Sequence, residues 1–310
     1  MNADPRLVGA MLRSDFYSFI RATFPIVSPS SAFAPNWHIE AIAFALMRVL
    51  RGEIKRLIIT VPPRSLKSIC ASVAFPAFVL GHDPTRRIIC VSYAEALARK
   101  HANDCRALMR STLYHRLFPN TRISNAKDTE LEFATTRGGN RLATSIGGTL
   151  TGRGGNLIVI DDPLKPQDAY SEAARENTKQ WYSNTLLSRL DDKTKDAIIV
   201  VMQRLHLDDL VGHLLEQEGW MHLNLPRSPS PNSASRSDQD AIICVGLATS
   251  CTPSGSRARS WTSSSGPWDR WTSQRSTSKS RSRRVATSSN GTGFSFTISR
   301  RAGHQTTGSS

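Results

Sequence analysis

Short apolar runs alternate with stretches of helical periodicity along the first 226 residues. The runs are rich in Ile, Val and Leu and have the length of strands that are buried on both faces of a sheet. We predict strands at residues 56–61, 87–92, 157–161, 197–202 and 221–225, and a hairpin of 132–134 with 141–145. The periodicity predicts helices at residues 6–23, 37–50, 67–80, 94–109, 171–188 and 207–215. This alternation is typical of an α/β domain built on a mainly parallel sheet.

The composition changes at Pro226. Residues 1–226 carry 28 Lys and Arg against 22 Asp and Glu, a net charge of +6, whereas the last 84 residues carry 12 against 3, a net charge of +9. That last part also has 23 Ser, 10 Thr and a single Leu, so it has too little apolar surface to offset the entropy of ordering the polypeptide. We predict an N-terminal helical segment at 1–30, a folded domain at 31–226 and a disordered Ser/Arg-rich tail at 227–310.

Several classes of protein do not fit the sequence. No apolar run is long enough for a membrane span, and Asp4 and Asp15 flank the N-terminal stretch where a signal peptide would be basic and then apolar. The five cysteines form no CxxC pair, and we expect reduced thiols, three of them packed in the core. The eight histidines form no HxxxH or HxH cluster, so no metal-binding signature is present.

The segment from Val61 to Ser68 joins a predicted strand to a helix and ends in Lys-Ser. There, backbone N–H groups can surround a polyphosphate while the lysine reaches the β- and γ-phosphates and the serine hydroxyl binds Mg²⁺. The glycines of the usual GxxxxGK[ST] pattern would fall at Val61 and Leu66 and are absent. A surface lysine beside a helix-capping serine is the alternative. The candidate phosphate-binding residues are Pro63, Arg64, Ser65, Leu66, Lys67 and Ser68.

A second motif lies at strand 157–161, where four apolar residues end in Asp161 and Asp162. This is the form of a Walker B strand, whose first carboxylate would hold the hydration shell of Mg²⁺ and whose second would orient the attacking water. The alternative is an acidic strand end that leads into a turn at Pro163. We interpret strand 87–92, which lies between the two motifs in sequence, as the extra strand of NTPases of the additional-strand type.

A third motif is Gln203-Arg204, at the end of strand 197–202, where a polar side chain can contact the γ-phosphate or the lytic water. All three motifs end their strands at the carboxyl edge of the sheet, where open α/β sheets bind ligands. Without the other two motifs, Gln203 and Arg204 would equally fit the start of a solvated loop.

With residues 62–68, 159–163 and 201–210 in this order, the chain resembles the large subunit of tailed-phage terminases over roughly residues 31–226. That family has a deviant Walker A motif in which an arginine replaces the loop glycine chemistry. The resemblance implies a P-loop NTPase fold and an ATP-driven motor that uses ATP and Mg²⁺ to move double-stranded DNA into a procapsid. It also implies a homo-oligomeric ring on the portal protein, a small terminase subunit as partner, no membrane association, and a place in the bacterial host cytoplasm and not in the mature virion.

The resemblance assigns roles position by position. Lys67 and Ser68 match the phosphate-binding lysine and the Mg²⁺-binding hydroxyl, and Arg64 matches the Walker A arginine that can touch the γ-phosphate. Asp161 matches the metal-binding acid of Walker B. Asp162 stands where many terminases have a catalytic Glu, so the resemblance implies a catalytic base with a shorter reach.

Gln203 and Arg204 match the coupling motif that links hydrolysis to domain movement in the family. Arg153 lies in a Gly-rich loop ahead of the Walker B strand and is a candidate arginine finger for a neighbouring subunit's site, although a loop arginine can also be merely solvated. Trp37 and His38 are candidates for the adenine-contacting region, with a core anchor as the alternative for Trp37.

A DNA motor must hold the phosphate backbone without reading sequence, so Lys and Arg side chains on one helix face are candidate contacts. A basic helix face can also be solvated without a partner. The candidates on the helix 94–109 and at its end are Arg99, Lys100, Arg106 and Arg110.

The tail departs from the family, whose large subunits continue into a ribonuclease H-like nuclease with two metals. Beyond Pro226 only Asp238, Asp240 and Asp269 are acidic, so no two-metal cluster can be assembled and we predict no nuclease activity. Our preferred hypothesis is a frameshift after Pro226 in a prophage remnant, and the alternative is a genuine basic tail that binds DNA. Translating the encoding DNA in its other two frames decides between them.

Two function classes follow: an ATPase of a packaging motor, or a DNA-binding remnant that does not hydrolyse ATP. A P-loop helicase is a third class, which the sequence favours less because no second motor domain is visible.

Overall fold

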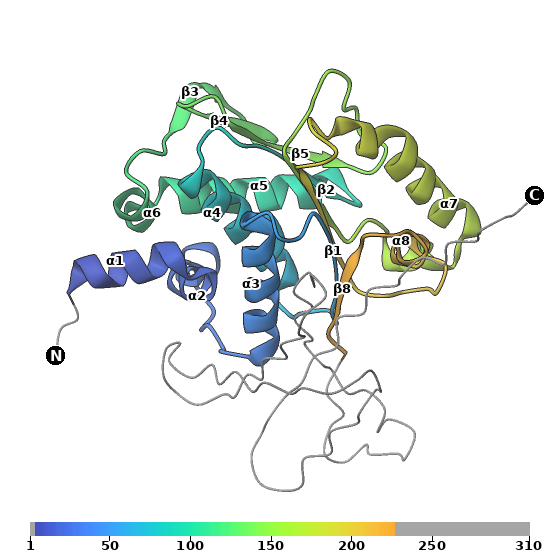
Figure 1. Ribbon diagram of the computed structural model, residues 1–310, viewed down its shortest axis with the longest axis horizontal. Coiled ribbons are helices and arrows are strands. Elements are labelled where there is room, and N and C mark those ends of the chain that lie inside the picture. The colour runs from blue at the N-terminus through green and yellow to red at the C-terminus, as the bar shows by residue number, and fades with distance from the viewer. Residues whose placement is uncertain (1–3, 227–310) are drawn as a thin grey trace, which may run out of the picture. The chain divides into compact units, whose positions relative to one another are not determined.

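The computed structural model describes residues 4–226, which form an eight-stranded sheet with helices on both faces (Figure 1). The strand order is β3-β4-β5-β2-β6-β7-β1-β8. The strands from β5 to β8 in this order are parallel to their neighbours, and β3 and β4 add an antiparallel edge. The strands are β1 Arg56–Thr60, β2 Arg87–Ser92, β3 Ile123–Asp128, β4 Glu132–Thr135, β5 Asn140–Ser145, β6 Leu157–Asp161, β7 Ala197–Met202 and β8 Met221–Asn224.

Within residues 4–226, three α-helices precede β1, and most of the others lie in the connections between strands of the parallel part of the sheet. The α-helices are α1 Pro5–Ser14, α2 Phe16–Val27, α3 Trp37–Leu50, α4 Phe75–His82, α5 Glu95–Arg110, α6 Thr112–Leu117, α7 Glu172–Trp181 and α8 Leu210–Leu215. Two π-helical segments, η1 Ile69–Ala74 and η3 Tyr182–Leu186, and two 3₁₀ segments, η2 Pro166–Tyr170 and η4 Leu187–Arg189, complete the set. The predicted α/β fold with a mainly parallel sheet is therefore confirmed.

The order of the strands corrects one prediction. The strand between the two motif strands β1 and β6 is β7, which pairs with both, whereas β2 lies on the far side of β6. The strand inserted between the two motif strands is thus residues 197–202 and not residues 87–92. The position of β7 matters for function because it carries Gln203 to the point between the ends of β1 and β6.

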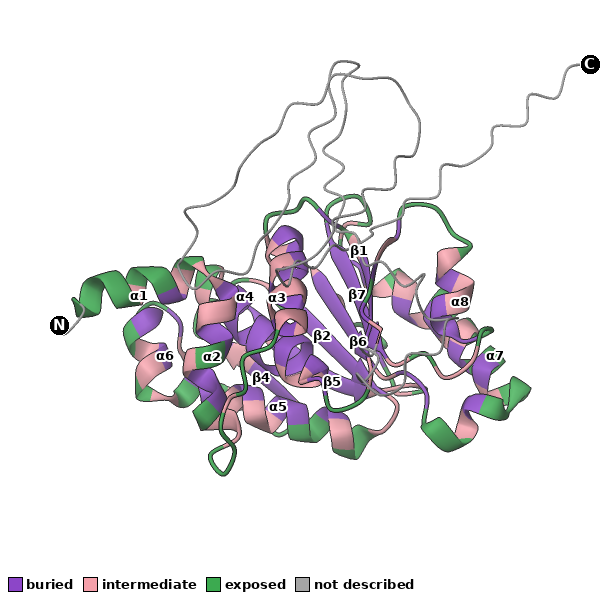
Figure 2. Ribbon diagram, turned by 90° about the horizontal axis from the view of Figure 1, so that it is seen from below, coloured by how far each residue is buried: buried purple, intermediate pink, exposed green. Residues whose placement is uncertain are grey.

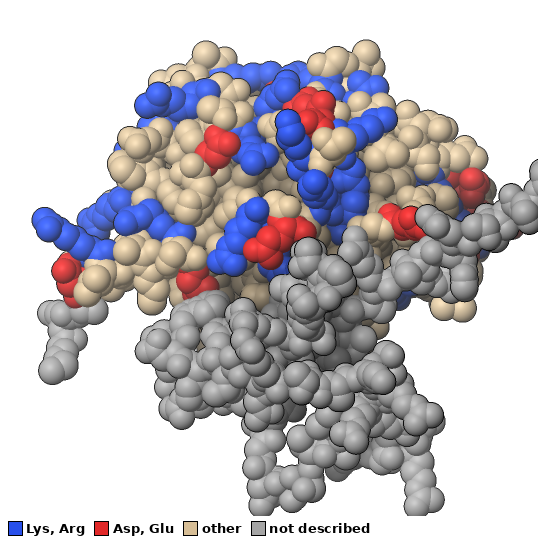
Figure 3. Space-filling model, viewed as in Figure 1, with Lys and Arg blue, Asp and Glu red and all other residues tan. Residues whose placement is uncertain are grey.

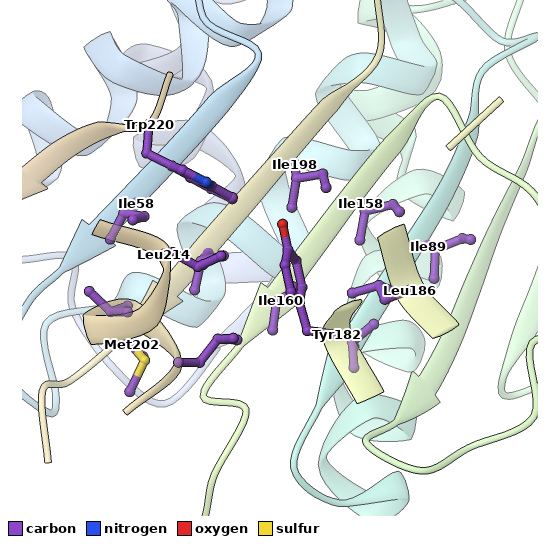
Figure 4. Close-up of a cluster of buried hydrophobic side chains, with 14 of the residues drawn as sticks. Ile58, Ile89, Ile158, Ile160, Tyr182, Leu186, Ile198, Met202, Leu214 and Trp220 are labelled. Atoms are coloured by element: carbon purple, nitrogen blue, oxygen red, sulfur yellow. The ribbon is translucent and has the colours of Figure 1, made fainter. Parts of the chain in front are cut away.

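The sheet is covered by helices on both faces (Figure 2). On β5, Ala143 packs against Ala98 and Ala102 of α5, while its neighbour Leu142 packs against a cluster that contains Tyr182. Because successive strand residues point to opposite faces, α5 and the Tyr182 cluster lie on opposite sides of the sheet. Figure 4 shows this second cluster, in which side chains of η3 and α8 meet the isoleucines of the central strands. Burial on both faces explains why the central strands are almost continuously apolar.

The N-terminal helix predicted at 6–23 is two helices. Asp15 ends α1 and its carboxylate accepts a hydrogen bond from Ser18 N–H at 2.9 Å, so it caps α2. The change of direction at this cap lets Phe16 and Phe19 pack in a tilted arrangement against Phe78 in the core. The periodicity of apolar residues runs through Asp15 and so did not reveal the boundary between the two helices, which the N-cap at Asp15 marks.

Other boundaries shift for similar reasons. The helix predicted at 207–215 begins at Leu210, because Asp209 accepts from Gly212 N–H at 2.9 Å and caps α8. The helices predicted at 67–80 and 171–188 occur, but each contains a π-helical stretch. The sequence pattern predicted neither α6 nor β3. Cys70, Cys90 and Cys105 are buried free thiols, as expected of three core cysteines.

No helix within residues 4–226 is long and apolar enough to cross a membrane. The predicted tail, its frameshift and the absence of a nuclease concern residues 227–310, which lie outside the described part of the protein.

Candidate nucleotide-binding site

The loop between β1 and the following helix has the backbone of an anion-binding loop. Arg64 and Leu66 adopt left-handed conformations, with φ of 61° and 58°. Left-handed residues in a tight turn direct successive N–H groups toward one point, where an anion can bind. Leu66 is the position at which the usual motif has its second glycine, so the backbone has the glycine conformation although the residue is Leu. For residues other than glycine this conformation costs about 1–3 kcal/mol each.

Contacts around the loop hold it in this strained form. Leu66 C=O accepts from Cys70 N–H at 2.9 Å, and the Ser65 hydroxyl donates to Pro62 C=O. His38, on the first turn of α3, places Nε2 3.2 Å from Ser65 C=O. His38 therefore lies against the candidate phosphate-binding loop, and Trp37, which is half-buried, lies beside it.

Lys67 begins the helix after the loop and points to the end of β6. Its Nζ lies 2.8 Å from Asp162 Oδ2, and the side chains of Lys67 and Asp162 are 9% and 23% exposed. The two motifs, predicted separately from sequence, thus meet through an ion pair. A polyphosphate that takes the place of the Asp162 carboxylate could pair with Lys67 in its stead.

Asp161 is buried beside the same helix. Its Oδ1 accepts from the Ser68 hydroxyl at 3.1 Å and its Oδ2 from the Ser72 hydroxyl at 2.7 Å. Burial raises the pKa of Asp161 to about 6, and the nearby Asp162 adds to the rise while Ser72, Lys67 and Ser68 oppose it. A bound cation would favour the ionised carboxylate in this environment.

The donor set fits Mg²⁺. A carboxylate oxygen and a hydroxyl oxygen that share one hydrogen bond face a common point, and Mg²⁺ prefers oxygen ligands. Within residues 4–226 no group of three or more His, Cys, Asp or Glu side chains is placed to hold a metal ion. Mg²⁺ is commonly held by one or two protein oxygens together with substrate phosphates and water.

Asp162 is held in place on three sides. It has a φ of 46°, its N–H donates to Val201 C=O at 2.9 Å, and its C=O accepts from Tyr93 N–H at 3.1 Å. Its Oδ1 accepts from the N–H of Gln203 at 3.3 Å. The end of β7 therefore touches the candidate catalytic carboxylate directly, through the backbone of the predicted coupling motif.

Arg204 is held by a buried carboxylate and by two backbone carbonyl groups. Its Nε donates to Asp209 Oδ2 at 2.9 Å, and its Nη2 donates to His206 C=O and Leu207 C=O. Asp209 is 1% exposed and caps α8, so the guanidinium of Arg204 ties the end of β7 to the start of that helix. In this conformation it serves as a connector between the site and α8.

The two other arginines are placed apart from each other. Arg64 is exposed on the phosphate-binding loop. Arg153 is 42% exposed, and its guanidinium lies 2.8 Å from Glu132 on β4. Since β5 and β2 separate β4 from β6, the guanidinium of Arg153 lies away from the site.

The predicted basic face of α5 is an ion-pair network. Each of the four side chains pairs with a carboxylate, and the four cations face four acids of the same protein. The pairs are Arg99 with Glu95 and Glu130, Lys100 with Asp104, and Arg106 and Arg110 with Asp128. Figure 3 likewise shows acidic side chains scattered among the basic ones on the face in view. The cations of α5 are thus paired with carboxylates of the same protein, and their contact with DNA stays a prediction.

Three buried residues behind Asp161 had no signal in the sequence. Ser72 donates to its carboxylate, Arg141 on β5 donates to Ser72 C=O at 3.0 Å, and His101 on α5 places Nδ1 3.6 Å from Asp161 Oδ2. Burial, with the nearby cations, lowers the pKa of His101 to about 3, so it is neutral near pH 7. The strand and helix periodicity gave no reason to single out any of the three.

Comparisons with known proteins find only distant likenesses. No protein-family profile and no curated protein sequence matches the chain. The large terminase of bacteriophage HK97 is 13% identical, with a TM-score of 0.42, over 66% of this chain and 40% of that protein. The large terminase ATPase domain of Thermus phage P74-26 is 17% identical, with a TM-score of 0.36, over 65% of this chain and 80% of that domain.

A complex of Saccharomyces cerevisiae Dbp5 with Gle1 contains a polypeptide that is 12% identical, with a TM-score of 0.39, over 60% of this chain and 46% of that one. This chain spans less than half the length of the HK97 protein. These likenesses are too distant to assign an activity, so the functional argument depends on the residues of the site.

Proposed function

We propose that the protein is a P-loop ATPase that binds ATP at loop 61–68 and hydrolyses it with Asp162 as the base. One observation carries the proposal. Lys67 and Ser68 of the loop contact the paired carboxylates Asp162 and Asp161, which lie more than 90 positions further along the sequence. A surface lysine beside a helix-capping serine gives no reason for these contacts.

The proposed reaction begins with an exchange of partners at Lys67. The triphosphate takes the place of Asp162 as the anion paired with Lys67, and the loop N–H groups bind its oxygens. Oδ2 of Asp162 is then free to orient a water molecule and accept its proton, while the N–H of Gln203 keeps Oδ1 fixed. Arg64, exposed on the loop, would contribute a further positive charge to the γ-phosphate.

Mg²⁺ would be held by Ser68 Oγ and Asp161 Oδ1. When bound, it would offset the negative charge of the phosphates. Asp161 suits this role better than Asp162 because it is buried and fixed by two hydroxyl groups, whereas Asp162 must change its partner during the reaction.

The finer role that we propose is that of the ATPase subunit of a phage DNA-packaging motor, which acts on double-stranded DNA as a ring. The order of the three motifs, with an arginine in the phosphate-binding loop, supports this role. A portal protein and a small terminase subunit would be its partners. In a ring, Arg153 could leave Glu132 and reach a neighbouring site. The buried Glu132 carboxylate would not be left unpaired, because it would keep its contacts with Lys127 and Asn140.

The test is ATP hydrolysis by the full-length protein, measured as phosphate release with and without double-stranded DNA. We expect Mg²⁺-dependent turnover that DNA increases, that Lys67→Ala abolishes and that the exposed-lysine variant Lys165→Ala retains. Turnover no higher than that of Lys67→Ala would rule out the ATPase and leave a DNA-binding remnant. Stimulation by single-stranded nucleic acid alone would contradict the packaging role and favour a helicase.

The role of Arg153 has its own test. Arg153→Ala should lose most of the DNA-stimulated turnover, whereas Arg137→Ala, which removes another exposed arginine, should retain it. If Arg153→Ala hydrolyses ATP like the wild type, Arg153 is not an arginine finger. Incubation of supercoiled plasmid with the protein and Mn²⁺ tests the predicted lack of nuclease activity, and cleavage would contradict it.

A further inference from the structure

Arg141 is the largest fully buried side chain among residues 4–226. It projects from β5, and its Nη2 donates to the backbone carbonyl oxygen of Ser72 at 3.0 Å. Its Nε and Nη1 have no hydrogen-bond partner within the described residues. A buried guanidinium with so few partners is costly to the fold, so its presence calls for a function or a compensating contact.

Ser72 connects this arginine to the candidate metal site. The residue is 1% exposed and lies in the π-helical segment η1, which follows the phosphate-binding loop. Its carbonyl oxygen accepts from Arg141, and its hydroxyl donates to Asp161 Oδ2 at 2.7 Å. Short π-helical segments often mark functional sites, and here the carbonyl and the hydroxyl of one serine in the segment contact a side chain of β5 and a side chain of β6.

The two oxygens of Asp161 thereby have different surroundings. Oδ2 is bound on the buried side by Ser72, and Oδ1 accepts from Ser68, which directly follows Lys67 at the start of the helix. His101 lies 3.6 Å from Oδ2, too far for a hydrogen bond, so Ser72 donates the inner bond that orients the carboxylate.

We infer that Arg141, acting through Ser72, is a positioning residue that holds the Asp161 carboxylate in the orientation required to bind Mg²⁺. The inference rests on the proposed ATPase function, because it concerns the metal of that site. Arg141 holds the backbone carbonyl of Ser72 and so the backbone position from which the Ser72 hydroxyl reaches Oδ2, which leaves Oδ1 directed toward Ser68. Bonds of this kind, one layer behind a metal ligand, are typically worth about 10- to 100-fold in metal affinity.

The test measures metal binding and not turnover. The full-length protein is titrated with mant-ADP, a fluorescent nucleotide without a γ-phosphate, in Mg²⁺ and again in EDTA. The ratio of the two dissociation constants reports how strongly the metal supports nucleotide binding. We expect Ser72→Ala and Arg141→Met each to reduce this ratio by about 10-fold or more, with the EDTA value unchanged. Thr144→Ala, on the same strand as Arg141, is the matched control.

The combination of the two changes is the sharper readout. Because both residues act on one oxygen of Asp161, the double variant should lose no more than Ser72→Ala alone. Arg141→Lys, which keeps a donor for the Ser72 carbonyl, should recover part of the ratio. If Arg141→Met fails to fold, Arg141→Lys carries the test for Arg141, because it should lose part of the ratio, and Ser72→Ala tests the hydroxyl while the bond between Arg141 and the Ser72 carbonyl stays in place.

The outcomes separate the inference from the proposed function. A wild-type protein that shows no Mg²⁺-dependent nucleotide binding overturns the proposed function and the inference with it. A wild-type protein with such binding, and variants that keep its ratio, overturns the inference alone. Variants that lose affinity equally in Mg²⁺ and in EDTA show that the residues only support the fold, which also overturns it.

Discussion

Replacing Asp162 with Asn should strengthen nucleotide binding and slow hydrolysis at the same time. At the observed 2.8 Å the attraction between Lys67 and Asp162 is ~6 kcal/mol for an effective dielectric constant of about 20, before the cost of desolvation. The net value of a hydrogen bond to a charged group is smaller, about 1.5–3 kcal/mol. ATP must displace this contact in the wild type but not in Asp162→Asn, so its affinity should rise by about 10- to 100-fold.

The hydrolytic rate should fall because an amide cannot accept a proton from water. The side-chain oxygen of Asn can still accept from Gln203 N–H, so the loop geometry is kept. Equilibrium titration with a fluorescent ATP analogue gives the affinity, and phosphate release gives the rate. Asp168→Asn, in the 3₁₀ segment after β6, is the matched control. Weaker nucleotide binding by Asp162→Asn, or an unchanged rate, would refute the exchange of partners at Lys67.

Three further predictions concern stability, each measured by urea unfolding. Arg204→Ala should destabilise the fold by about 2 kcal/mol or more, because the buried Asp209 loses its cation, and a second change to Asp209→Ala should recover part of the loss. Gly139→Ala should cost about 1–3 kcal/mol, since a Cβ there would overlap two backbone oxygens; a neutral effect would mean that the hairpin can shift. Burial, with the nearby Arg204, lowers the pKa of His222 to about 4, so the folded state binds fewer protons than the unfolded state below about pH 6.5. The free energy of unfolding should therefore fall between about pH 6.5 and 4. The fall should be up to about 3 kcal/mol larger in the wild type than in His222→Gln. Equal pH dependence in the two proteins would contradict this assignment.

The strands and the loop were predictable because their signals are local. Helices cover both faces of the sheet, so the side chains of strand 157–161 are apolar on both faces. The acids that follow this strand lie at the carboxyl edge of the sheet, where the strand ends. The meeting of Lys67 with Asp162 followed from this logic of strand ends. The left-handed backbone at Leu66 did not, because Leu gives no signal for a conformation that glycine usually supplies.

What the sequence left open depends on spatial neighbours. The order of the sequence places 87–92 between the two motif strands, whereas the sheet places β7 there. The cations of α5 form a basic stripe in the sequence, but Asp128 and Glu130 come from a later segment to balance them. Arg141 has the pattern of a polar hairpin position and is in fact fully buried.

The most direct measurement is a crystal structure of the full-length protein with ADP, a fluoride analogue of the γ-phosphate and Mg²⁺. We expect the diphosphate in the loop at Arg64 and Leu66, the metal between Ser68 and Asp161, and Lys67 moved from Asp162 to the phosphates. A nucleotide bound elsewhere, or bound in the loop while the ion pair between Lys67 and Asp162 stays intact, would contradict the proposed site.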